Sequence, residues 1–202
     1  MELLQPQWFW PMCLFSFVTS VTPGPNNMML LASGVNFGLR ATLRHWLGIS
    51  VGLLVMLVAV GMGLAEVFTR FPLAHTVMRW GGMAYMAYLA VKIACSSVGA
   101  RDDVQRAQPM GFFAAAAFQA VNPKCWIMAV GYFSAYVPSG HGVGYIALAA
   151  VLFACINFPS CGSWIVLGQS LRHMLSKPAQ QRGFNIVMGV LLLGSTVSMA
   201  WA

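Results

Sequence analysis

An interruption inside an apolar stretch constrains this fold more than any other feature of the sequence. The stretch runs from Trp8 to about Ser33 and contains the segment Thr22-Pro23-Gly24-Pro25-Asn26-Asn27. Two prolines and a glycine within three positions cannot continue an α-helix, because proline lacks an N–H group and clashes with the preceding turn, while glycine adds backbone freedom. Proline suits the first position of a helix, so we expect Pro25 to begin a second half-helix.

The composition places this interruption in a membrane. Of the 202 residues, 59% are hydrophobic and only 7% are charged, a balance typical of integral membrane proteins rather than soluble domains. In hydrocarbon, irregular backbone is tolerated only against protein or a wet cavity. The N-terminus of a half-helix there carries free N–H groups and partial positive charge, which suits a carboxylate.

Apolar runs of about 20 residues predict an all-α protein with six transmembrane helices. No Lys or Arg precedes Arg40, so the first run lacks the basic start of a signal peptide, and we expect it to be retained as a span. The whole chain, 1–202, reads as a single transmembrane transporter domain. The predicted spans are 8–33, 46–66, 73–95, 111–137, 143–169 and 183–202.

The net charge of +7 comes from basic residues scattered between the apolar runs, which favours topology signals over nucleic-acid binding. Most of them fall in the first, third and fifth connections. The positive-inside rule then places these connections in the cytoplasm and both termini in the periplasm. The basic residues counted there are Arg40, Arg44, Lys92, Arg101, Arg106, Arg172, Lys177 and Arg182, against Arg70 and Arg79 on the other side.

A second interruption lies in the fourth span, at Gln119-Ala120-Val121-Asn122-Pro123-Lys124. Asparagine is a good N-cap and proline a good first helical residue, so this segment can end one half-helix and begin another. The two interruptions divide the chain into two three-helix repeats, about 8–98 and 109–202, of opposite orientation. Corresponding breaks in inverted repeats indicate a transporter binding site. The alternative is a pair of proline kinks that only shape the bundle.

Lys124 favours the binding-site interpretation. It lies about a dozen residues from either end of its predicted span, a depth at which a charge is costly and usually functional. It could meet a substrate carboxylate or take part in proton coupling. The expected substrate-binding residues are Thr22, Pro23, Gly24, Pro25, Asn26, Asn27, Asn122, Pro123 and Lys124.

Other polar residues in the spans leave two interpretations open. Asn157 and Ser160 flank Pro159 in the fifth span and either line the same cavity or repair the hydrogen bonds that the proline frees. Gln119 either lines the cavity or bonds between helices. Gly48 and Gly52 form a G-x-x-x-G spacing, which we attribute to packing within the bundle.

The sequence predicts no metal site and no cofactor. The four histidines stand singly at the edges of the predicted spans, and the five cysteines show no ligand spacing. No hydrolase motif is present, so an enzyme is not expected. One rival function stays open, a membrane thiol-redox carrier that uses Cys13 and Cys125, although the two cysteines do not occupy equivalent positions in the repeats.

The two broken spans resemble those of the LysE/RhtB family of amino-acid exporters. The similarity rests on Thr22-Pro23-Gly24-Pro25-Asn26 and Asn122-Pro123-Lys124, and extends to the segments 48–52, 82–92 and 182–193. It implies a six-span bacterial inner-membrane protein that exports amino acids or their derivatives at the expense of the proton gradient. The implied partners are a small-molecule substrate and lipid, and a homo-oligomer is left open.

The resemblance also bears on the substrate. Many relatives with other substrates, including basic amino acids, have an acidic residue early in the second span, where this chain has Leu53 after Gly52. The pattern is closest to the cysteine and O-acetylserine exporters, so a small neutral amino acid of that kind, or of the threonine and homoserine kind, is implied. The acidic residues Glu2, Glu66, Asp102 and Asp103 all lie away from mid-membrane, so the carrier of a coupled proton is not evident.

Overall fold

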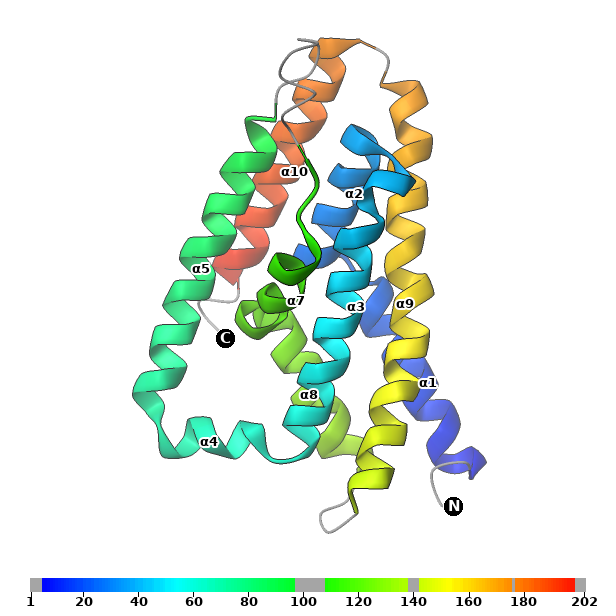
Figure 1. The fold of residues 1–202 in the computed structure, drawn as a ribbon, viewed down its shortest axis with the longest axis vertical. Coiled ribbons are helices and arrows are strands. Elements are labelled where there is room, and N and C mark those ends of the chain that lie inside the picture. Colours follow the sequence, from blue (N-terminus) through cyan, green and yellow to red (C-terminus); the bar gives the residue numbers. More distant parts are fainter. Residues whose placement is uncertain (1–4, 97–107, 138–141, 176, 199–202) are drawn as a thin grey trace.

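The computed structural model describes residues 5–96, 108–137, 142–175 and 177–198, and every regular element in these ranges is a helix (Figure 1). The all-α class is therefore confirmed. The connection that holds Arg101, Asp102, Asp103 and Arg106 lies outside the described residues, as does Glu2. The helices are α1 (Pro6–Val21), α2 (Pro25–Phe37), α3 (Leu39–Gly61), α4 (Leu64–Arg70), α5 (Pro72–Ala94), α7 (Phe112–Val121), α8 (Pro123–Tyr136), α9 (Val143–Met174) and α10 (Pro178–Ser198).

Both predicted interruptions break a helix at the expected residues. Helix α1 ends at Val21 and α2 begins at Pro25, while α7 ends at Val121 and α8 begins at Pro123. Each proline occupies the first helical turn, where its missing N–H group would have no partner in any case. The two breaks thus create four half-helices.

The predicted start of the second span was wrong. Helix α3 begins at Leu39 rather than at residue 46, and the rest of the predicted 46–66 span is divided between the end of α3 and the short helix α4. Gly38 explains the early start, because its φ of 80° reverses the chain within one residue. Arg40 and Arg44 then lie in the first turns of α3, where long basic side chains can reach water from the membrane edge.

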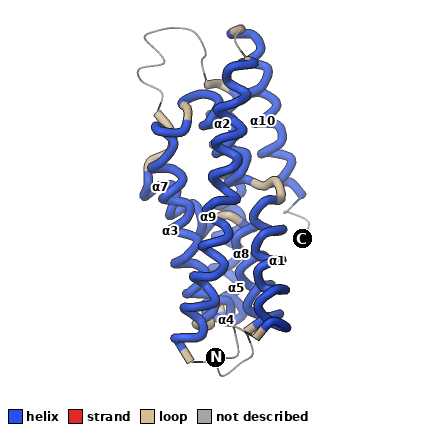
Figure 2. The backbone as a smooth tube through the Cα atoms, turned by 90° about the vertical axis from the view of Figure 1, so that its right-hand side faces the viewer, coloured by secondary structure: helices blue, strands red, loops and turns tan. Residues whose placement is uncertain are grey.

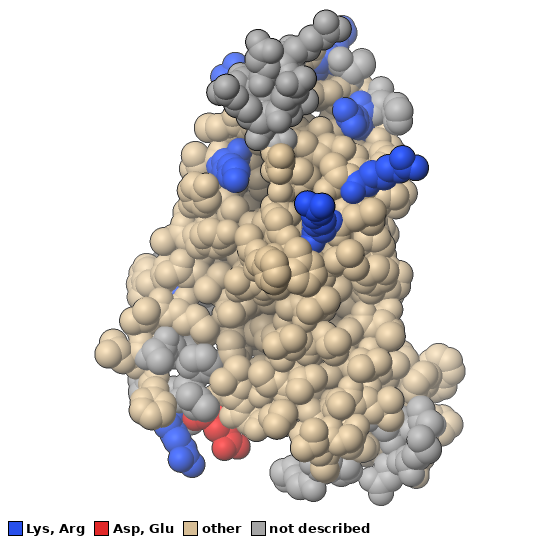
Figure 3. All heavy atoms as spheres, in the orientation of Figure 1, with Lys and Arg blue, Asp and Glu red and all other residues tan. Residues whose placement is uncertain are grey.

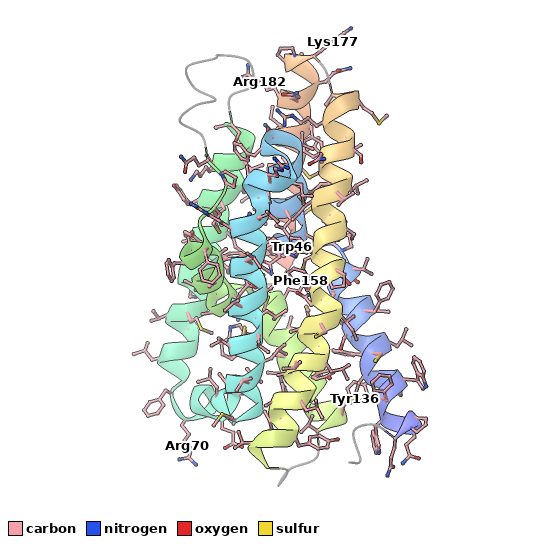
Figure 4. The ribbon with its side chains drawn as sticks, turned by 45° about the vertical axis from the view of Figure 1, so that its right-hand side comes forward. Trp46, Arg70, Tyr136, Phe158, Lys177 and Arg182 are labelled. Carbon is pink, nitrogen blue, oxygen red and sulfur yellow. The ribbon has the colours of Figure 1, made fainter. Side chains whose placement is uncertain are left out.

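The predicted irregularity in the fifth span does not end the helix. Helix α9 continues through Pro159 and extends to Met174, beyond the predicted limit of residue 169. The side chain of Trp46 stacks on Phe158 with ring centroids 4.1 Å apart, and its indole nitrogen donates to the Phe158 carbonyl at 3.0 Å (Figure 4). Packing against α3 therefore supports α9 at the proline.

The helices form one elongated bundle in which the chain passes repeatedly between two ends (Figures 1 and 2). Helices α1 and α2 follow one another from the lower to the upper end in Figure 1, and α3 returns beside them. Helix α5 rises and α7 and α8 descend, after which α9 rises and α10 descends. The most extensive contacts are those of α2 with α9, α3 with α7, and α5 with α10. Both breaks lie about halfway between the two ends of the bundle (Figure 1).

Small residues allow the closest of these approaches. Gly48 and Gly52 of α3 face α7, and a Cβ atom built on Gly52 would lie 2.5 Å from the Ala116 carbonyl oxygen. The G-x-x-x-G pair thus packs against another helix of the same chain, as predicted from the sequence. Without a hydrophobic force between helices in lipid, such backbone contact is a main source of association.

We expect Gly52→Ala to destabilise the protein, because the new methyl group meets the backbone of Ala116 rather than a movable side chain. Overpacking of this kind costs about 1–3 kcal/mol. Gly81→Ala is the matched control, since nothing lies within 4 Å of a Cβ built at Gly81. Thermal unfolding of the purified protein in detergent measures both. Equal melting temperatures for the two variants would show that the α3–α7 contact contributes nothing.

The distribution of side chains is that of a membrane protein. Large apolar residues are exposed on most of the described helices, with Trp10, Leu73 and Phe113 more than half exposed, while asparagine, glutamine and serine side chains are buried inside. Among the described residues, Leu39–Gly61 and Val143–Arg172 are long and apolar enough to cross a membrane. On the face shown in Figure 3, basic side chains gather toward the upper end and a belt without charges lies below them.

Candidate functional site

The two helix breaks meet through Lys124. Its Nζ atom donates a hydrogen bond to the backbone carbonyl of Thr22, which lies just after the last turn of α1. The lysine stem passes over Gly24, where an added Cβ would lie 2.5 Å from the Lys124 Cδ atom. A residue larger than glycine at position 24 would displace the lysine. The contact therefore joins residues that are 102 positions apart and belong to opposite halves of the chain.

Asn26 forms a second link between the breaks. Its Nδ2 atom donates to Gln119 Oε1 at 2.8 Å, and Gln119 Nε2 donates back to Asn26 Oδ1 at 3.3 Å. Gln119 is buried, and its Nε2 also donates to the Ala115 carbonyl at 2.9 Å. The Cys125 thiol donates to Gln119 Oε1 at 3.1 Å. Gln119 thus takes the interhelical role that the sequence left open, holding α7 against the start of α2.

Asn27 supports the backbone of the first break. Its Nδ2 atom donates to the carbonyls of Ser20 at 2.8 Å and Thr22 at 2.9 Å, and the side chain is buried. These carbonyls lie at the end of α1, where a helix has no partners of its own for them. Both donor hydrogens of the Asn27 amide are therefore committed to the break itself. Its Oδ1 atom accepts from the Cys161 thiol, with 3.7 Å between oxygen and sulfur.

The second break is capped locally. Asn122 is the N-cap of α8, and its buried side chain accepts a hydrogen bond from the Lys124 backbone N–H at 3.2 Å. The Trp126 indole nitrogen donates at 2.7 Å to the carbonyl of Ala120, which lies in the last turn of α7 and has no donor there within the helix. Asn122 thus orients the first turn of α8, from which the Lys124 side chain extends toward Thr22.

Of the polar residues around Pro159, Asn157 bonds to another helix, while Ser160 bonds within α9 to a carbonyl other than the one that the proline frees. Asn157 Nδ2 donates to Ser20 Oγ at 3.0 Å, and Asn157 Oδ1 accepts from the Cys161 thiol at 3.5 Å, so α9 contributes directly to the site. Ser160 donates within its own helix to the Ile156 carbonyl at 2.8 Å. Asn157 therefore belongs to the cavity, whereas Ser160 is occupied by its own helix.

A small cavity of about 20 Å³ lies at the centre of these contacts. It has room for about one water molecule, so the arrangement is closed around its own side chains. Of the residues expected from the sequence, Gly24, Asn26, Asn27, Asn122, Lys124 and Asn157 line it. Thr22, Pro23, Pro25, Pro123, Gln119 and Ser160 are not among its lining residues, although Thr22 and Gln119 bond to residues that are. The other lining residues are Thr19, Ser20, Leu53, Cys125, Met128 and Cys161.

The two cysteines of the redox hypothesis line different spaces. Cys125 lies in the central cavity, while Cys13 lines a groove of about 830 Å³ between the outer face of α1 and Tyr136, together with apolar residues such as Trp10 and Phe17. All five cysteines are free thiols. Among the described residues, no group of three or more His, Cys, Asp or Glu side chains could hold a metal ion.

These features define a class of protein. The chain forms a helical membrane bundle in which two broken helices present amide groups, one ammonium group and backbone carbonyls to a common interior point, as in carriers of small polar solutes.

Comparison with known proteins names the family within that class. Residues 17–201 match the model of the LysE type translocator family, and the chain belongs to this family. It is similar to proteins named cysteine/O-acetylserine efflux protein from Escherichia coli (strain K12), Shigella flexneri and Escherichia coli O1:K1 / APEC. Each is 32% identical over 187 residues, which cover 92% of this chain and 92% of the relative. No solved structure matches the chain.

Proposed function

We propose that the protein exports a small neutral amino acid, of the cysteine and O-acetylserine kind, across the bacterial inner membrane. The names of the relatives support the substrate class. The hydrogen bond from Lys124 on one broken helix to the Thr22 carbonyl on the other is the observation that carries the proposal, because it places a cation and a backbone acceptor together at the two breaks.

The substrate's two charged groups fit these two partners. Its carboxylate binds Lys124 and the N–H groups at the starts of α2 and α8, where Pro25 and Pro123 begin the half-helices. Its ammonium takes over the Thr22 carbonyl that Lys124 occupies in this structure. The Asn27 amide is committed to the carbonyls of the break, so it acts by shaping the site rather than by donating to the substrate.

The proposed topology has six spans in two inverted repeats, with α1–α2 and α7–α8 as the broken helices. Lys177 and Arg182 lie at the upper end of the molecule and Arg70 at the lower end (Figure 4). The positive-inside rule puts the upper end in the cytoplasm and both termini in the periplasm. The substrate therefore enters from the upper end and leaves from the lower end.

Proton coupling, if present, runs through Lys124 or through the substrate's own amine. Glu66, in α4 at one end of the bundle, is the acidic residue among those that the structure describes. The described interior therefore offers basic and amide groups but no carboxylate to carry a proton.

Counterflow in proteoliposomes tests the proposed function. We expect labelled O-acetylserine or cysteine to exchange in a saturable manner, and arginine and lysine to be excluded because the described cavity has no acidic residue. An imposed pH gradient then shows whether transport is proton-coupled. Failure of folded protein to exchange cysteine, O-acetylserine, threonine, homoserine or leucine would refute the proposal.

The Cys13→Ser/Cys125→Ser double variant separates transport from the redox alternative. Serine preserves the donor that Cys125 directs to Gln119 Oε1, so we expect counterflow within about a factor of three of the unmodified protein. Loss of transport in the double variant, with full activity in Cys95→Ser/Cys155→Ser, would favour chemistry at the thiols.

A further inference from the structure

A second cavity, larger than the one at the breaks, lies in the upper half of the bundle. Its volume is about 620 Å³, within the range of small-molecule sites. It is lined by the upper parts of α2, α3 and α5 and by the segment 108–111 that leads into α7. We call it the upper cavity.

One layer of side chains separates the upper cavity from the central site. Met29 lies one turn beyond Asn26 on α2, lines the upper cavity, and packs in a buried cluster with Phe118, the neighbour of Gln119. Tyr85 also lines the cavity, and its ring centroid is 5.9 Å from that of Phe118. A solute in the upper cavity would therefore lie next to the residues that hold the two breaks together.

His45 is the polar group in this cavity that lacks a partner. It lines the upper cavity and is only 2% exposed, yet neither ring nitrogen has a hydrogen-bond partner among the described residues. Helix α3 begins at Leu39 and buries this histidine about one and a half turns from its start. Leaving a buried polar group unpaired costs about 1–3 kcal/mol, so its retention indicates a partner that arrives from the cavity.

The remaining lining indicates the charge of that partner. Lys92 is the single charged side chain among the described residues that line the cavity, and the neutral hydrogen-bonding groups include Ser33, Asn36, Ser96 and Gln108. Ser33 already bonds to Thr42, Asn36 to Asn185, and Ser96 to the Lys92 carbonyl, so Lys92 and His45 carry the argument for a ligand. A polar cavity with one cation and no described carboxylate is suited to a small solute with a carboxylate.

We propose that the upper cavity is a second binding site for the exported amino acid, which holds it on the cytoplasmic side before it reaches the breaks. His45 is a direct contact of the bound solute, and Lys92 attracts its carboxylate at the cavity rim. This site rests on the proposed function for its ligand, but it binds independently of Lys124.

Protection of an engineered thiol tests this site. In a chain with Cys13, Cys95 and Cys155 replaced by serine, Ser33→Cys places a near-isosteric thiol in the cavity lining, while Cys125 and Cys161 stay buried. The probe is O-acetyl-L-serine at ten times its dissociation constant. We expect it to slow reaction with a small methanethiosulfonate about tenfold, because only the unoccupied fraction reacts. The same protection is expected when Lys124→Ala is added.

His45→Leu is expected to raise the dissociation constant of O-acetylserine, measured by protection, about tenfold. His45→Gln is expected to keep the affinity, because its amide can still hydrogen-bond to the solute. Because His45 has no described partner to lose, His45→Leu is expected to leave the melting temperature unchanged or raised. Replacing a histidine that stabilises the fold would lower the melting temperature.

Three outcomes would overturn the inference. They are a Ser33→Cys thiol that does not react at all, a thiol that O-acetylserine does not protect, and protection that disappears with Lys124→Ala. If the unmodified chain transports O-acetylserine and any of these is found, only the second site fails. If protection is found but counterflow is absent, the second site stands and the proposed export function fails.

Discussion

Replacing Lys124 with alanine is expected to abolish transport while leaving folded protein in the membrane. Among the described residues, the substitution removes the cation at the central cavity and the side chain that joins the second break to the Thr22 carbonyl. A hydrogen bond to a charged group contributes up to about 3 kcal/mol, which corresponds to a fall of about 100-fold in counterflow.

Two further variants sharpen this experiment. Lys177→Ala is the matched control, because Lys177 is exposed at the end of the bundle, and we expect full transport from it. Lys124→Arg retains the positive charge but cannot release a proton at physiological pH. Exchange that survives in Lys124→Arg without response to a pH gradient would identify Lys124 as the proton carrier. Unchanged counterflow in Lys124→Ala would refute its assignment to the substrate carboxylate.

Asn27→Ala is expected to destabilise the protein by about 3 kcal/mol, which lowers the melting temperature by about 10 °C. The effect comes from the two hydrogen bonds of the Asn27 amide. The Ser20 carbonyl loses the donor that satisfies it inside the bundle, while the Thr22 carbonyl loses one of its two donors and keeps Lys124. Thermal unfolding in detergent and the yield of monodisperse protein measure the effect.

The neighbouring asparagine provides the control for that prediction. Asn26 donates to the Gln119 side chain rather than to the carbonyls at the end of α1, so Asn26→Ala is expected to lose transport with a much smaller loss of stability. A larger loss of stability in Asn26→Ala than in Asn27→Ala would contradict the division of roles that the hydrogen bonds indicate.

The positions of the breaks could be predicted from the sequence almost to the residue. Pro25 and Pro123 begin the half-helices as expected, because the geometry of proline and the capping ability of Asn122 act over a few neighbouring residues. The start of α3 could not be predicted in the same way. Arg40, Arg44 and His45 interrupt the apolar pattern, yet the helix already includes them, since hydropathy marks the hydrocarbon boundary rather than the helix boundary.

The composition of the site was harder to predict than its location. Asn26 and Lys124 follow from the break motifs, but the bonds of Asn26 to Gln119 and of Asn157 to Ser20 depend on which helices become neighbours. The alignment of α2 with α9 and of α3 with α7 is determined by contacts between distant segments, and a local pattern contains no information about them. For the same reason His45 was missed, because its significance lies in the cavity beside it.

The Lys124 ammonium occupies the Thr22 carbonyl and therefore competes with the substrate for it. Under the proposed function, an amino acid must displace the lysine ammonium from the carbonyl that its own ammonium needs, so the free energy of binding is reduced by the strength of the internal contact. Weak binding suits a carrier that works only when the solute accumulates in the cell. The same contact reforms as the solute departs, which hastens release on the far side and sets a concentration threshold below which the cell retains its amino acid.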